Sequence, residues 1–444
     1  MQIIVCVVFV HICSYEFKTF QKQTNTAELV RTKTSRGGGQ ATLKMPQVLM
    51  EVLPNIHVGN IYITLPETSE SCRDVCVEKS RCVVQLQSDQ EVCFNLPRGT
   101  CLKPDVVRSI SQEGQVVTVR VQLDERTSLI STLASDLMND SDLQTVVPLS
   151  STLCNTELLG HCKQCEQQVF ECVRFQRVLP LPSVDWEQAS EDWFCHIHKE
   201  DGEKLKPASL QPEEDECFYT ELFFLLHPKL MEYMEHAKPT CGPEINCAKC
   251  NTSLGVQLHQ SVKMWTHNLV WRRERGNIVH STDISAIMLM LFQNIDKDNF
   301  GVNCRLVLQL PTVPRRYLYM VTMNTNQKLL ICEEDSKLFH TGGNEKENQC
   351  KENRPEGGVA TKRARRSGQT EMKLQAVFGV KLLYVEKEGD DEESGEWADS
   401  VHVHLIPCSD SFFTGVKALL DTTNNCLPEN IRHVEKMKVG YIIK

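Results

Sequence analysis

The stretch QVVTVRVQLD, residues 115–124, alternates between apolar and polar side chains. Val117, Val119 and Val121 fall on one side of an extended chain, whereas Thr118 and Arg120 fall on the other. This period of two is typical of a half-buried β-strand, because successive side chains of a strand point to opposite faces. Neighbouring apolar runs are short and bounded by turn residues, so residues 46–150 are predicted to form a β-rich domain, a sandwich or an open barrel.

The chain around this stretch is too large for one compact core. Its 444 residues favour two or three domains. The net charge of −10 argues against a broad nucleic-acid-binding face, so we predict no direct contact with nucleic acid. No apolar run approaches the length of about twenty residues that a membrane-spanning helix needs, and we predict no membrane partner.

Residues 1–45 are predicted to be a disordered leader, because the stretch is polar and glycine-rich after its first apolar run. That first run is about a dozen residues long, too short to span a bilayer. A secretory signal peptide is the alternative, although no basic residue precedes the run.

Downstream of residue 255 the pattern mixes helix and strand. Residues 256–339 are predicted as an α/β segment whose helix, at 281–295, begins with Ser281 as N-cap and Asp283 in the first turn. Its apolar positions recur at helical spacing, which indicates a core helix or, as the alternative, a helix that docks a partner. Three runs after it, CRLVLQL, YLYMVTM and KLLICEE, are predicted as strands of a second sheet.

Residues 340–372 have almost no apolar side chains and are predicted to be a disordered basic linker. Within it, TKRARR places Lys362, Arg363, Arg365 and Arg366 together, a pattern typical of a nuclear-import signal or of a solvated charge cluster. Residues 373–444 are the predicted C-terminal segment, with a helix whose apolar face carries Phe412, Val416, Leu419 and Leu420.

Cysteine is used heavily, with 21 residues in the chain. Such usage fits either a secreted, disulfide-bonded protein or an intracellular protein whose thiols bind metal. The cysteines lack the dense, regular spacing of a small disulfide scaffold, so we favour the reduced, intracellular interpretation.

Two pairs of cysteines have the spacing of metal ligands. Residues 151–255 contain Cys162-x-x-Cys165 and Cys247-x-x-Cys250, and two intervening residues let both sulfurs of a pair face one ion. Four thiolates would complete a tetrahedral, structural zinc site with no position left for catalysis. The 81 residues at positions 166–246 separate the pairs, so separate structural or redox pairs remain the alternative.

A further cysteine lies outside these pairs, in the stretch RVLPLPSVDWEQASEDWFCHIH at residues 177–198. Trp193, Cys195 and His196 are compressed into four positions that do not offer good geometry for one ion. Cys195 is therefore interpreted either as a small buried hydrophobe beside packed tryptophans or as a thiol presented to something else.

The order of these motifs resembles the family of HECT-like ubiquitin-protein ligases, also described as proteins that bind ubiquitin-conjugating enzymes. The shared order is Cys-x-x-Cys, Leu-Pro-Leu-Pro-Ser, Trp-x-Cys-His, Cys-Phe and Cys-x-x-Cys-x-x-x-Leu-Gly. The resemblance covers about residues 46–444 and is firm between Cys162 and Gly255.

The resemblance implies ubiquitin transfer. The chain would bind a cell-cycle ubiquitin-conjugating enzyme, accept ubiquitin and pass it to substrates. A HECT-type mechanism needs a cysteine nucleophile near the C-terminus, and Cys408 and Cys426 are the candidates. The family's own cysteine falls nearer Ser411 in this sequence.

The resemblance also implies a non-enzymatic alternative. The Trp-x-Cys-His segment is similar to a motif that occupies the active site of the zinc-dependent endonuclease of pre-mRNA 3′-end processing. The thiolate of Cys195 would then be a ligand to the partner's zinc, with Trp193 and His196 in the partner contact, and would displace the attacking water. Pro180 and Pro182 would stiffen the approach.

Together these inferences predict an α+β protein, mostly β, of two packed lobes, with a four-cysteine zinc site tying the middle region together. Zinc is the predicted cofactor. The predicted partners are a ubiquitin-conjugating enzyme, ubiquitin and the 3′-end processing endonuclease. We predict a cytoplasmic protein, with the basic linker as the signal that would take it to the nucleus.

Overall fold

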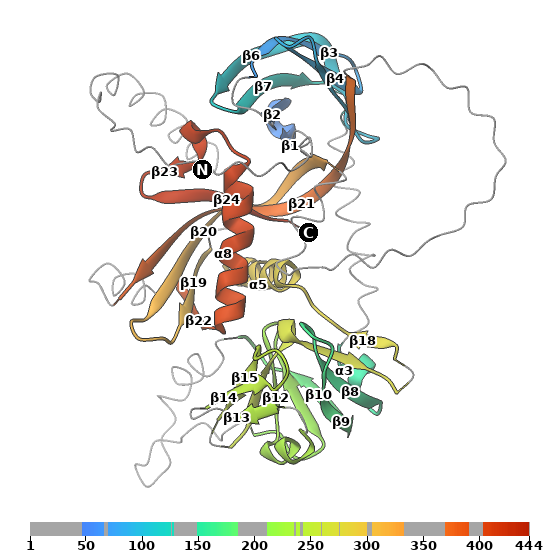
Figure 1. Ribbon diagram of the computed structural model, residues 1–444, viewed down its shortest axis with the longest axis vertical. Helices are drawn as coiled ribbons and strands as arrows, with labels where there is room; N and C mark the ends of the chain where they lie inside the picture. Colours follow the sequence, from blue (N-terminus) through green and yellow to red (C-terminus); the bar gives the residue numbers. More distant parts are fainter. Residues whose placement is uncertain are drawn as a thin grey trace, which may run out of the picture. The chain divides into compact units, whose positions relative to one another are not determined.

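The computed structural model describes residues 47–65, 70–125, 127, 149–184, 211–234, 237–239, 243–258, 260–274, 276–299, 304–332, 369–389 and 403–443 (Figure 1). All of them belong to one compact unit, Met45–Lys444. The described fold is mostly β, as predicted from the sequence. None of its helices has the length and apolar character needed to cross a bilayer.

The largest sheet of the described residues has 13 strands, of which nine follow the order β3-β4-β5-β21-β20-β1-β2-β7-β6 and four branch from this path. Its strands are β1 (Gln47–Leu53), β2 (Val58–Thr64), β3 (Cys72–Val77), β4 (Arg81–Leu86), β5 (Glu91–Asn95), β6 (Leu102–Glu113), β7 (Val116–Leu123), β19 (Arg305–Leu310), β20 (Arg316–Cys332), β21 (Gln369–Glu388), β22 (Val403–Pro407), β23 (His433–Val434) and β24 (Met437–Ile443).

This sheet curls until its two edges nearly meet. The Cys72 amide of β3 donates to Gln112 Oε1 of β6 at 2.9 Å, and Gln112 Nε2 donates to the Glu70 carbonyl at 2.8 Å. Val117, Val119 and Val121 of β7 point into the enclosed core, which confirms the strand predicted from their alternation. An almost closed sheet leaves little unpaired edge on this side of the fold.

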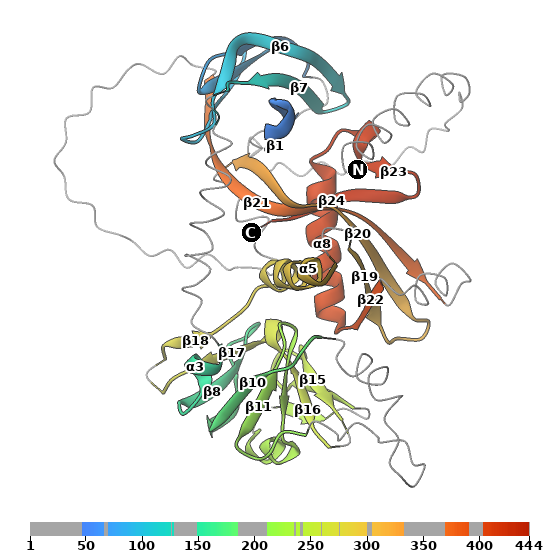
Figure 2. The ribbon, with the colours of Figure 1, turned by 180° about the vertical axis from the view of Figure 1, so that it is seen from behind.

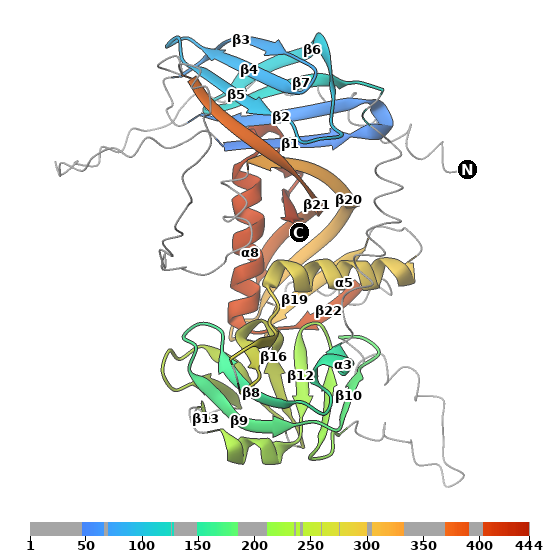
Figure 3. The ribbon, with the colours of Figure 1, turned by 90° about the vertical axis from the view of Figure 1, so that its right-hand side faces the viewer.

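Two long strands connect the N-terminal strands with the C-terminal ones (Figure 3). Residues 328–331 of β20 pair with β1, whereas its residues 316–321 pair with β19. Residues 369–373 of β21 run parallel to β5, and residues 379–384 pair with β24. The runs YLYMVTM and KLLIC, predicted as separate strands, are therefore one strand, and β21 begins inside the range predicted as a linker. Because one sheet contains both the N-terminal and the C-terminal strands, the predicted division into two lobes is not confirmed.

The middle of the chain forms two smaller sheets. Their orders are β10-β11-β12-β16-β15-β14-β13 and β18-β17-β8-β9. The strands of the first are β10 (Arg177–Pro180), β11 (Glu216–Tyr219), β12 (Phe223–Leu226), β13 (Ala237–Pro239), β14 (Glu244–Cys247), β15 (Ser253–Gln257) and β16 (Val262–Trp265). The second contains β8 (Glu157–Cys162), β9 (Gln168–Arg174), β17 (Leu269–Arg272) and β18 (Ile278–His280).

An aromatic cluster holds these two sheets together. Trp271 of β17 is fully buried, and its ring stacks on Phe170 at 5.6 Å between centroids. Phe175 and Phe224 contact the same indole edge-on, each at 5.9 Å. Phe224 belongs to β12 of the seven-stranded sheet, whereas Trp271 belongs to β17 and Phe170 to β9 of the four-stranded sheet. The cluster therefore joins both sheets in one core.

The described helices are α3 (Leu149–Leu153), α5 (Ile284–Asn299) and α8 (Asp410–Asn425), with short 3-10 turns η2 (Pro54–Ile56), η3 (Pro228–Tyr233), η4 (Thr266–Asn268) and η5 (Glu429–Ile431). Helices α5 and α8 lie against β20, β21 and β24 (Figure 2). Ile287, Met288, Leu291 and Phe292 of α5 are buried there, which favours the core-helix interpretation over a docking helix.

The start of α5 differs from the prediction. The helix begins at Ile284, and the Ile287 amide donates to the Asp283 carbonyl at 3.0 Å, so Ser281 is not its N-cap. Helix α8 follows the expected pattern. Ser409 is its N-cap and accepts a hydrogen bond from the Phe412 amide.

A buried carboxylate fixes the centre of the large sheet. Glu51 of β1 is 3% exposed and accepts hydrogen bonds from Tyr441 at 2.6 Å, Tyr62 at 2.8 Å and Asn60 at 3.2 Å. Lys381 Nζ of β21 lies 2.7 Å from it. Burial by itself raises the pKa of the Glu51 carboxyl, but the Lys381 charge and these donors outweigh burial and hold the pKa below its ordinary value.

Replacing Lys381 should lower the free energy of unfolding, because Glu51 would remain buried without its counter-charge. In Lys381→Met the Glu51 carboxylate loses its counter-charge, and we expect the free energy of unfolding at pH 7 to fall by about 3 kcal/mol. In the wild type, Glu51 stabilises above its unfolded-state pKa, and this stability is lost as pH falls through its lower folded-state pKa. Urea denaturation from pH 3 to pH 7 measures both effects. The matched control is Lys373→Met, an exposed lysine of the same strand; equal losses in the two variants would contradict the role of the ion pair.

Candidate metal centre at the four-cysteine cluster

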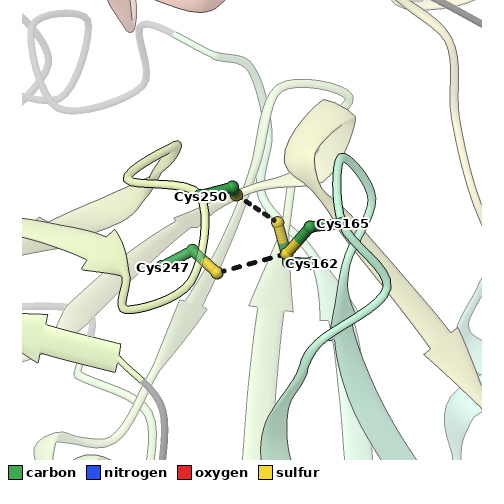
Figure 4. A group of neighbouring side chains, drawn as sticks. All are labelled: Cys162, Cys165, Cys247 and Cys250. Carbon is green, nitrogen blue, oxygen red and sulfur yellow. Dashed lines mark hydrogen bonds between the residues drawn. The ribbon is translucent and has the colours of Figure 1, made fainter.

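The two Cys-x-x-Cys pairs meet in space. Cys162 ends β8 and Cys247 ends β14, while Cys165 and Cys250 lie in the turns that follow (Figure 4). The four sulfur atoms all lie within 4.8 Å of one another, and the 162–250 and 165–247 sulfur pairs are each separated by 3.6 Å. The prediction that one site joins the distant pairs is therefore confirmed in its geometry.

The two turns have the same backbone structure. The Glu166 amide donates to the Cys162 carbonyl at 2.9 Å, and the Asn251 amide donates to the Cys247 carbonyl at 2.8 Å. Both closing residues adopt a left-handed conformation, with φ of 58° at Glu166 and 60° at Asn251. Each turn thus folds its two sulfurs to one side, as a chelating knuckle requires.

The sulfur spacing fits a tetrahedral ion. A metal–sulfur bond of about 2.3 Å places the sulfurs of a regular tetrahedron about 3.8 Å apart. The 3.6 Å separations are close to that edge length, and they are much longer than a disulfide bond. None of the four cysteines of the cluster is part of a disulfide.

Electrostatics also favour a cation at this cluster. Burial raises the pKa of the Cys162 thiol well above its ordinary value and raises that of Cys165 as well. For Cys250, burial also acts to raise the pKa, but contacts with Thr252 and the neighbouring sulfurs bring it down to about 7. Four thiols in a partly buried cluster can all become thiolates only if a positive charge compensates them, and a metal ion supplies it.

The cluster could hold a metal ion with a closed coordination sphere. Four sulfur ligands leave no position for water or substrate, which is typical of a structural site. An all-sulfur set selects soft or borderline metals. Because β8 and β14 belong to different sheets, a metal here would join the four-stranded sheet to the seven-stranded one.

The candidate nucleophiles lie elsewhere, in the core. Cys408 follows β22, is 3% exposed, and packs among side chains of α5 and α8. Burial raises the pKa of its thiol strongly. Cys426 follows α8, is 6% exposed, and donates from Sγ to the Thr422 carbonyl at 3.5 Å in a different hydrophobic cluster. The structure therefore brings neither sulfur to the surface and does not bring the two together.

Trp193, Cys195 and His196 lie outside the described residues, as do the basic residues 362–366. The strands that bracket the Trp-x-Cys-His segment are described. β10 and β11 run parallel, with Arg177 opposite Glu216, and these two side chains form an ion pair of 2.6 Å.

A polar group at the start of α8 was not predicted from the sequence. His267 Nε2 lies 3.0 Å from Ser411 Oγ and 3.1 Å from Ser409 Oγ, and Asn268 Nδ2 donates to Ser411 Oγ at 2.8 Å. Burial, together with the charge of Lys163, lowers the pKa of His267 to about 3, so the imidazole stays neutral and is a poor general base. No local pattern could have revealed this group, because 142 positions separate His267 from Ser409.

Comparison with known proteins adds a family. The model of a family described as HECT-like ubiquitin-conjugating enzyme (E2)-binding matches residues 51–439. A Mus musculus protein named as an E3 ubiquitin-protein ligase is 21% identical over 412 residues, which cover 89% of this chain and 97% of that protein. Proteins of the same name from Rattus norvegicus (21% identical, 63% of this chain and 69% of theirs) and Bos taurus (20%, 79% and 86%) are similar as well. No solved structure matches.

The cysteine cluster predicts a defined metal content. We expect the purified chain to hold one metal ion, and Cys162→Ser and Cys247→Ser to lose it, because three sulfurs leave the ion open to water and to competing chelators. Elemental analysis of the protein after gel filtration measures the number of metal ions per chain. Cys172→Ser is the control, since Cys172 is an exposed cysteine outside the cluster. A wild-type chain without metal, or retention of metal by both ligand variants, would show that the cluster is not a metal site.

Proposed function

Because the chain belongs to the family of HECT-like proteins that bind ubiquitin-conjugating enzymes, we propose that it is a ubiquitin-protein ligase. It docks a ubiquitin-conjugating enzyme charged with ubiquitin and promotes transfer of that ubiquitin to substrates. The observation that carries this proposal is the extent of the family match, residues 51–439, which begins in β1 and ends in β24. The mouse relative that carries the ligase name is covered over 97% of its length.

The metal of the four-cysteine cluster is zinc in this proposal. Zinc favours four thiolates in a tetrahedron, and such sites serve structure rather than catalysis. When bound, zinc would neutralise thiolate charge and hold the two knuckles together. The spacing and the closed geometry of Cys162, Cys165, Cys247 and Cys250 support this choice.

The route of ubiquitin through the chain depends on the cysteines near the C-terminus. A thioester intermediate needs an accessible thiolate. Cys408 and Cys426 are both buried, and burial raises the pKa of Cys408. Their environment therefore favours direct transfer from the conjugating enzyme, in which the ligase orients the thioester and the acceptor amine without a covalent intermediate of its own.

Reconstituted ubiquitination separates these routes. With activating enzyme, ATP and a panel of charged conjugating enzymes, we expect the chain to accelerate loss of ubiquitin from its cognate enzyme onto lysine. We expect Cys408→Ala and Cys426→Ala to retain this activity, because neither sulfur lies at the surface. Non-reducing gels follow any adduct, and Cys304→Ala is the control because Cys304 is equally buried in the same cluster as Cys408.

Two outcomes would change the proposal. An unchanged discharge rate across the whole panel would reject ligase activity. A reducible ubiquitin adduct that disappears in Cys408→Ala or Cys426→Ala, but persists in Cys304→Ala, would establish a thioester at that sulfur.

A second candidate function is inhibition of the zinc-dependent endonuclease of pre-mRNA 3′-end processing by Cys195. It is supported by the Trp193-x-Cys195-His196 segment and by the cluster, whose four sulfurs complete a tetrahedral site without Cys195. A thiolate outside the protein's own metal site could coordinate a partner's zinc and displace the nucleophilic water. This function requires entry to the nucleus, for which the basic residues 362–366 would be the signal.

A pull-down with wild type and Cys195→Ala tests the inhibitor function. We expect the wild-type chain to retain the endonuclease and suppress its cleavage of RNA, and Cys195→Ala to do neither, because alanine cannot coordinate zinc. Cys172→Ala, which removes an exposed cysteine of β9, should behave as wild type. Inhibition that survives in Cys195→Ala would rule out this sulfur as the inserted ligand.

A further inference from the structure

One residue of the first knuckle reaches away from the sulfurs. Lys163 lies between the ligand positions Cys162 and Cys165, and its Nζ donates to the Thr282 carbonyl at 2.9 Å and to Asp283 Oδ1 at 2.5 Å. These two residues immediately precede α5, which begins at Ile284. The side chains of Lys163 and Asp283 are 31% and 59% exposed, so the ion pair lies open to solvent, whereas the hydrogen bond to the Thr282 carbonyl is partly buried.

The backbone of the same residue leads to the second helix. The Lys163 amide donates to the Asn268 carbonyl at 2.9 Å. The side chain of Asn268 then donates from Nδ2 to Ser411 Oγ, in the first turn of α8, at 2.8 Å and to the Ser253 carbonyl at 2.7 Å. Ser253 begins β15, three residues after Cys250, so Asn268 contacts the segments next to both knuckles as well as α8.

Within the described part of the chain, the lysine of the second knuckle contacts the other knuckle instead of a helix. This lysine, Lys249, occupies the position before Cys250, and its Nζ donates to the Cys165 carbonyl at 3.4 Å. That contact stays within the cluster. The two pairs have the same spacing and the same turn, and they differ in where the side chains between the cysteines reach.

We propose that metal bound at the four cysteines fixes the positions at which α5 and α8 begin, with Lys163 and Asn268 as the positioning residues. This inference rests on the proposed metal site. With metal bound, Cys162 and Cys165 are held rigidly, and Lys163 is held with them. Without metal, the knuckle can move. Lys163 then no longer has a fixed position, and its hydrogen bonds to Thr282, Asp283 and Asn268 weaken.

Hydrogen exchange of the full chain, followed by mass spectrometry, tests the coupling. On chelation of the metal, we expect amides in residues 284–292 and 410–418 to exchange roughly five- to thirty-fold faster, because the helix starts lose partly buried contacts. Strand β7, in the enclosed core of the large sheet, is the internal reference and should not change. Faster exchange in β7 as well would indicate global unfolding and overturn the inference.

Variants separate the positioning residues from the metal site. Lys163→Met should keep a full metal content, yet residues 284–292 should already exchange at the metal-free rate. Asn268→Ala should also keep a full metal content, while residues 410–418 should exchange at the metal-free rate. Lys249→Met is the matched control, a lysine between the cysteines of the other knuckle, and should exchange as wild type.

The failure of the metal site and the failure of the coupling are distinguishable. A chain that holds no metal would overturn the metal site and this inference together. Two results would overturn this inference alone. One is a normal metal content with hydrogen exchange of α5 and α8 that does not change on chelation. The other is an equal change of exchange in Lys163→Met and Lys249→Met.

Discussion

The middle of the chain depends on the charge state of four sulfur atoms that lie within 4.8 Å of one another. Burial opposes ionisation of Cys162 and Cys165, so four mutually repelling thiolates cannot form there without a compensating cation. The constraint is mechanical as well, because β8 and β14 contribute one knuckle each and belong to different sheets. The aromatic cluster around Trp271 supplies an apolar contact between those sheets, and the sulfur cluster supplies a second, polar one.

Local patterns in the sequence predicted the parts of this structure that local chemistry determines. The alternation around Val119 predicted β7, and the helical spacing in residues 281–295 predicted α5. The Cys-x-x-Cys spacing predicted a four-sulfur site, because the ligand geometry of a knuckle is contained in its own turn. Even here the start of α5 was misplaced, since Ser281 has the residue type of an N-cap although the helix begins after Asp283.

What remained unpredicted is non-local. The pairing of β20 with β1 and of β21 with β5 joins segments more than 200 positions apart, and their registers depend on partners that no local pattern specifies. This pairing places N-terminal and C-terminal strands in one sheet. The polar group of His267, Ser409 and Ser411 was missed for the same reason, because its members are unremarkable serine and histidine residues until the fold brings them together.

A closed metal site can influence function only through the geometry that it imposes, because it offers no open position for chemistry. The residues between the ligands therefore matter as much as the ligands. In one knuckle Lys163 extends to the start of α5, and its amide contacts Asn268, which in turn contacts the start of α8. In the other, Lys249 contacts the opposite knuckle through the Cys165 carbonyl. Helices α5 and α8 cover β24, in which the family match ends, and Cys408 packs in the same hydrophobic cluster as both helices. The four-cysteine cluster, the two helices and the C-terminal strands are therefore parts of one connected structure. In the proposed ligase, which would work by orienting the reacting groups rather than by a nucleophile of its own, such a connection would limit displacements of those groups, and small displacements cost large factors in rate.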